Sequence, residues 1–98
     1  MEIYEIPLTP LPNQSFQVSV SELSLNLTIR LKQLSKILIM DLYNDDKVIF
    51  LGVNCKANYN LMSPFFYKIP NFILMFISDN EIFSYLDLGN KAKLYYVV

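Results

Sequence analysis

Residues 23–32 alternate without interruption between apolar and polar side chains. Leucine or isoleucine occupies every second position, and serine, asparagine, threonine, arginine and lysine stand between them. Successive side chains of a β-strand point to opposite faces of the sheet, so this spacing produces one dry and one wet face. On an α-helix the same leucines would be scattered around the cylinder. The stretch therefore predicts a long β-strand with one face in a hydrophobic core.

The rest of the chain shows similar short stretches separated by turn-forming residues. The strongest turn signal is Asn44-Asp45-Asp46-Lys47, because Asn and Asp tolerate left-handed backbone. Further strands are expected at residues 3–6, 16–20, 37–43, 48–53, 72–78 and 91–98, with a bulge at Gly52. Residues 54–71 are expected to be an irregular loop, and residues 80–88 fit either a helical turn or a short strand.

This spacing predicts an all-β fold. We expect a small antiparallel β-sandwich or a partly open β-barrel of six to seven strands, with at most one short helical turn. No stretch is long enough for the helical crossovers that a parallel sheet requires.

The 98 residues are enough for one domain only, residues 1–98. Pro7, Pro10 and Pro12 lack amide donors and restrain the residues before them, so we expect residues 1–12 to form an extended arm beside a β core of residues 15–98. A pre-ordered arm loses little entropy on docking, and it is predicted to lie on a neighbouring subunit. Removal of residues 1–12 is then expected to leave a folded core that no longer assembles.

The chain lacks the residues on which most catalytic and metal sites depend. It has no histidine, which removes the commonest general base and the usual zinc ligands. Cys55 is the single cysteine, and two glycines cannot build a phosphate-binding loop. Asp45 and Asp46 supply too few oxygens for calcium, and Asp41 is expected at an exposed strand position. We predict no enzyme activity, no cofactor and no metal site.

Charge and hydropathy argue against nucleic acid and membrane as partners. The net charge is −1 and the basic residues are scattered, so no basic patch exists for a phosphate backbone. The start of the chain is acidic, unlike a secretory signal, and the longest apolar run, residues 72–77, is far shorter than the ~20 residues of a membrane span. These features predict a soluble, cytoplasmic protein.

Three of the expected strands, residues 37–43, 72–77 and 94–98, carry large apolar side chains on both faces. An antiparallel sheet normally leaves one face wet. Either the loop or the arm covers the second face, or that face meets another subunit. Loop aromatics often anchor interfaces, although here they could equally fill the end of the sandwich. The candidate interface residues are Tyr4, Pro7, Pro10, Phe65, Phe66 and Tyr67.

The amino-terminal motif Tyr4-Glu5-Ile6-Pro7-Leu8-Thr9-Pro10, followed by Pro12-Asn13-Gln14-Ser15-Phe16, resembles the start of phage baseplate plug proteins, small tail components of contractile-tailed phages. Three further segments resemble the family in the same order: residues 25–31, residues 40–45 (Met-Asp-Leu-Tyr-Asn-Asp), and residues 86–89 with 94–97. The resemblance extends over nearly the whole chain. Residues 54–72 depart from it most.

The resemblance implies an architectural, non-enzymatic protein of a phage or prophage tail baseplate, packed against tail-tube or hub proteins. It implies residence in the virion tail after synthesis in the cytoplasm of the bacterial host, and self-association is possible. The alternative function is a small β-barrel that binds an apolar ligand in its interior. About eight strands are the minimum for such an interior, which is more than this sequence offers.

Overall fold

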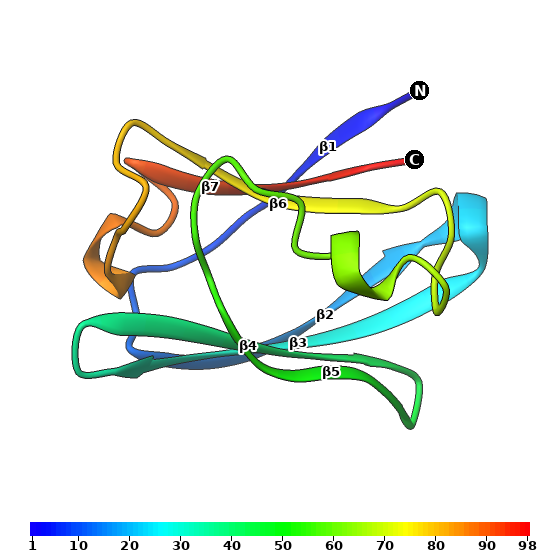
Figure 1. Ribbon diagram of the computed structural model, residues 1–98, viewed down its shortest axis with the longest axis horizontal. Helices are drawn as coiled ribbons and strands as arrows, with labels where there is room; N and C mark the ends of the chain where they lie inside the picture. Colours follow the sequence, from blue (N-terminus) through cyan, green and yellow to red (C-terminus); the bar gives the residue numbers. More distant parts are fainter.

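Two antiparallel sheets face each other as separate layers (Figure 1). The computed structural model describes residues 1–98. The small sheet has the order β1-β7-β6 and the large sheet the order β2-β3-β4-β5. The strands are β1 (Ile3–Ile6), β2 (Asn13–Val20), β3 (Leu25–Leu34), β4 (Ile37–Asn44), β5 (Lys47–Asn54), β6 (Ile73–Ser78) and β7 (Ala92–Val97). No strand of one sheet pairs with the other, so the fold is a sandwich, and the barrel alternative does not apply.

Strand β3 is the alternating stretch of the sequence and forms an inner strand of the large sheet. Leu25, Leu27, Ile29 and Leu31 are buried on its inner face, whereas Asn26 and the other polar residues face outward. Its neighbours β2 and β4 pair with it in unbroken antiparallel register. The predicted dry and wet faces are confirmed.

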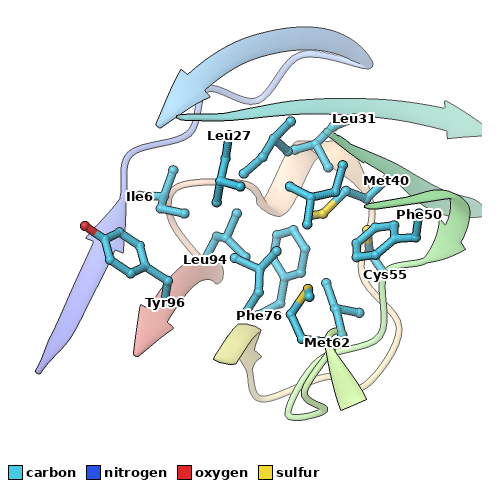
Figure 2. Close-up of a cluster of buried hydrophobic side chains, with 14 of the residues drawn as sticks. Ile6, Leu27, Leu31, Met40, Phe50, Cys55, Met62, Phe76, Leu94 and Tyr96 are labelled. Carbon is cyan, nitrogen blue, oxygen red and sulfur yellow. The ribbon is translucent and has the colours of Figure 1, made fainter. Parts of the chain in front are cut away.

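One hydrophobic core fills the space between the sheets (Figure 2). Phe76 of β6 is fully buried, and its ring centroid lies 4.9 Å from that of Phe83 in the connection to β7. Leu27 and Met40 approach from the large sheet, and Leu94 approaches from the small sheet (Figure 2). The side chains of both layers thus interdigitate in a single cluster of 24 buried residues.

The chain contains three short 3₁₀ turns, where the sequence led us to expect at most one. Residues Ser21–Leu23 form the first 3₁₀ turn, between β2 and β3, and the left-handed Ser24 follows them. Residues Ser63–Phe65 form the second, within the loop expected at residues 54–71, with a proline in its first turn. Residues Tyr85–Asp87 form the third, because Ser84 caps it and Asp87 bonds back to the Ser84 backbone. Of the ambiguous residues 80–88, Tyr85–Asp87 therefore form a helical turn, and no strand forms among them.

The long connection from β5 to β6 climbs from the large sheet to the small one and covers the outer edge of β6 (Figure 1). The Asn58 backbone N–H donates to the Phe76 carbonyl at 2.6 Å, and the Leu61 N–H donates to the Leu74 carbonyl at 2.8 Å. This connection leaves the outer face of the small sheet uncovered, and Ile77 on that face is 46% exposed.

The expected arm divides into two parts in the structure. Residues Ile3–Ile6 form β1, pair with β7, and place Ile6 in the core. The Leu8 carbonyl lies so close to Gly89 that a β-carbon there would collide with it, and Gly89 has φ +81°. The description as an extended, irregular arm therefore applies to residues 7–12.

Candidate interaction surfaces

The three loop aromatics Phe65, Phe66 and Tyr67 are divided between the core and the surface. Phe65 is half-buried and packs against the core, and its ring centroid lies 5.0 Å from that of Phe50. Phe66 and Tyr67 are each 68% exposed and meet edge to face with centroids 6.4 Å apart. Of the three loop aromatics, Phe66 and Tyr67 are therefore the ones that present most of their side chains to solvent.

Lys68 anchors this aromatic loop to the large sheet. Its Nζ donates a hydrogen bond of 2.8 Å to the Ile49 carbonyl of β5. The same ammonium lies 6.0 Å from the ring centroids of Phe65 and Tyr67, within the range of a cation–π contact. Phe66 and Tyr67 are thus held in position before any partner arrives, which lowers the entropy cost of binding.

Tyr4, the first candidate residue, is engaged within the domain. Its ring stacks on Tyr96 of β7 with centroids 5.0 Å apart. Its hydroxyl bonds to the carboxylates of Glu2 and Glu22, the latter at 2.9 Å, so it ties β1 to the turn after β2. These two hydrogen bonds raise the pKa of Tyr4, and the bond to Glu2 has a larger effect than the bond to Glu22. The pKa rises because the hydroxyl must keep its proton to donate to a carboxylate.

Pro7 and Pro10 are exposed on the arm between the two sheets. Leu8, between them, packs partly against the core. The arm is also held by the Gln14 side-chain amide, which donates to the Thr9 carbonyl at 2.7 Å. Both prolines are therefore accessible on a segment that is fixed to its own domain.

Phe66 is surrounded by further apolar side chains that the sequence pattern did not single out. Ile3, Val97 and Ile73 lie side by side across β1, β7 and β6, because Val97 pairs with both others. Beside them is a groove of about 410 Å³ whose lining includes Phe66 and the first and last residues of the chain. We name this surface the terminal patch and define it as Met1, Ile3, Phe66, Tyr67, Ile73 and Val97. The apolar residues on both faces of the last strands were its signal in the sequence.

Asp41 has a structural role that its position in an apolar run did not reveal. β5 carries an extra residue opposite it, because Met40 pairs with Val53 and Leu42 pairs with Phe50. Gly52 adopts φ +65° in this bulge, and its N–H donates to Asp41 Oδ1 at 2.7 Å. The predicted bulge is confirmed, and the carboxylate stabilises it.

Replacing Asp41 with alanine is expected to lower the free energy of unfolding by about 1–2 kcal/mol, because the Gly52 N–H loses a charged acceptor. Asp41→Asn retains an oxygen at the same position and is expected to cost less than half as much. Urea unfolding of the three proteins measures both values. An alanine variant as stable as the wild type would contradict this role.

Cys55, the single cysteine of the chain, lies in the core. The Cys55 thiol is buried, and burial raises its pKa, so it remains protonated at neutral pH. No cluster of three or more histidine, cysteine, aspartate or glutamate side chains is placed to hold a metal ion. Buried side chains of both sheets form one cluster between the layers, and the groove of the terminal patch lies at the surface.

Comparison with known families shows which family the chain belongs to. The model of the family described as cyanophage baseplate Pam3 plug gp18 matches residues 3–98. The chain belongs to this family of phage baseplate plug proteins. No curated protein matches the chain. The family resemblance found in the sequence is thereby confirmed, and the match includes β1 and the arm as well as the rest of the plug domain. This plug protein contains no helix long and apolar enough to cross a membrane.

Proposed function

We propose that this protein is a structural, non-enzymatic component of a phage tail baseplate, and that it works by packing against hub or tail-tube subunits in the virion. The observation that carries the proposal is the family match over residues 3–98. The terminal patch supplies a surface suited to such contacts, since exposed apolar side chains rimmed by polar ones commonly mark protein interfaces.

Phe66 and Tyr67 are the expected anchors of this contact. Both are largely exposed, aromatic and held by the Lys68 anchor, and aromatic side chains dominate the binding energy of interfaces. Phe65 and Tyr4, which pack inside the domain, are expected to support the patch and not to touch the partner directly.

The double substitution Phe66→Ala/Tyr67→Ala is expected to weaken binding to the hub or tube subunit of the same phage by about 30-fold or more, which corresponds to ~2 kcal/mol. Calorimetry or co-elution with each purified subunit measures the effect. The matched control is Leu86→Ala, because Leu86 is 63% exposed but lies in the 3₁₀ turn at the opposite end of the sandwich (Figure 1).

The control is expected to bind as the wild type does. Equal binding by the double variant would remove the terminal patch from the interface. A wild-type protein that binds neither hub nor tube subunits would overturn the proposed function itself.

A further inference from the structure

The sandwich has four sheet edges, and three of them are protected against pairing with another chain. The edge of β6 is covered by the connection that contains Asn58 and Leu61. The edge strand β5 is interrupted by two register shifts, and Lys68 bonds to its Ile49 carbonyl. The edge strand β1 has four residues and is followed by Pro7. Bulges, lysines, prolines and short strands are the usual means of preventing edge-to-edge association.

The fourth edge strand, β2, is preceded by Pro12 but carries none of these protections within its own length. It runs for eight residues in continuous register with β3, and it contains no charged residue, no proline and no bulge. The residues on its outer face are polar and exposed. On its inner face, Gln14, Phe16 and Val18 are only half-buried.

The backbone groups along the free edge of β2 can be assigned from the pairing. The Gln33 N–H donates to the Pro12 carbonyl at 2.8 Å, which makes Pro12 and Gln33 a hydrogen-bonded pair. In an antiparallel ladder such pairs alternate along the strand, so the even-numbered residues of β2 bond to β3. The N–H and C=O groups of the odd-numbered residues point away from the sheet. These are Asn13, Ser15, Gln17 and Ser19, and all are exposed.

We propose that the free edge of β2 pairs antiparallel with β2 of a second copy, so that the two large sheets become one continuous eight-stranded sheet. The pattern of the strand supports a copy of itself as the occupant. A two-fold axis beside Phe16 places Asn13 opposite Ser19 of the copy and Ser15 opposite Gln17, so all outward-pointing groups find partners in about eight hydrogen bonds.

This register is also the one that best completes the inner face. Phe16 lies opposite Phe16 of the copy, and Gln14 lies opposite Val18, so the half-buried side chains of each protomer cover those of the other. A shift by two residues in either direction leaves one outward-pointing residue beyond the end of the partner strand. The absence of charge on β2 means that the self-paired edge brings no like charges together.

The inference goes beyond the proposed contact with hub or tube subunits and uses a different surface. It is tested by sedimentation equilibrium of the purified protein over a concentration series. The wild type is expected to show a reversible monomer–dimer equilibrium. Gln17→Pro removes an outward N–H without touching the ladder to β3, and it is expected to weaken the dimer by ~10-fold or more. The matched control, Gln17→Ala, keeps that N–H and is expected to remain within ~3-fold of the wild type.

Disulfide trapping tests the register independently. Residues opposite each other in a non-hydrogen-bonded antiparallel pair have Cα atoms about 4.5 Å apart, which is within the range for a disulfide. Phe16→Cys is therefore expected to form a covalent dimer on mild oxidation, whereas Val18→Cys, opposite Gln14 of the copy, is not. The buried Cys55 is common to both variants.

Either of two results would overturn the proposal: a wild-type protein that stays monomeric at millimolar concentration, or a Val18→Cys variant that cross-links as readily as Phe16→Cys. A monomeric wild type whose binding to a hub or tube subunit is lost in Gln17→Pro would assign the edge to that subunit instead. If the protein binds that subunit through Phe66 and Tyr67 but forms no dimer, the proposed function is supported and the β2 dimer is ruled out.

Discussion

Phe76→Ala is expected to lower the free energy of unfolding by about 3–5 kcal/mol, because it leaves a cavity at the centre of the sandwich. Phe76 has no exposed surface and packs against Phe83. A domain of this size has a total stability of roughly 5–15 kcal/mol, so the variant is expected to be largely unfolded at moderate urea concentration. Urea unfolding followed by circular dichroism measures the loss.

Ile77→Ala is the matched control for this experiment. Ile77 follows Phe76 on β6 but faces outward and is 46% exposed, so its truncation removes little buried surface. Its expected cost is below about 1 kcal/mol. If both variants lost equal stability, the inward and outward faces assigned to β6 would be wrong.

Deleting residues 1–6 is the second change with a large expected effect, and here the structure alters what we expect of the arm. Strand β1 covers one edge of β7 and places Ile6 in the core, and Tyr4 stacks on Tyr96. Its removal exposes the backbone edge of β7 and the inner side chains beneath. The deletion is therefore expected to unfold the domain or to lower its stability by several kcal/mol, and not only to prevent assembly.

Two isoleucines of β1 separate these possibilities. Ile6→Ala is expected to cost about 2–5 kcal/mol because Ile6 is 4% exposed, whereas Ile3→Ala, at 65% exposure, is expected to leave stability nearly unchanged. A stable, folded deletion variant would show instead that residues 1–6 are detachable, as the sequence suggested for an arm of residues 1–12.

The strands could be predicted from the sequence because their signals are local. The alternation in β3 and the Asn and Asp residues of the β4–β5 turn depend only on near neighbours, and the structure reproduces both. The turn after β2 was less clear, since no glycine marks it and Ser24 takes the left-handed conformation instead. The third 3₁₀ turn is capped by Ser84, a signal that the ambiguous apolar pattern around it obscured.

The features that the sequence did not reveal depend on residues far apart in the chain. The role of Asp41 requires Gly52, and the burial of Phe65 requires Phe50. Likewise, Ile3 contributes to the terminal patch only because β1 pairs with the last strand. Apolar residues on both faces of a strand indicate that a second surface exists, but the arrangement of the sheets determines where that surface lies.

The mutual hydrogen bonds between the Glu2 and Val98 backbones bring both ends of the described chain to the same corner of the small sheet (Figure 1). Val97 and Met1 of the terminal patch lie at this corner, so a purification tag at either end would lie beside the surface that we propose as a partner contact. A short linker could join Glu2 to Val98 directly, and new ends could open at the exposed Ser35–Lys36 turn at the far end of the sandwich. Circular permutation thus offers a labelled form of the protein in which the terminal patch stays free.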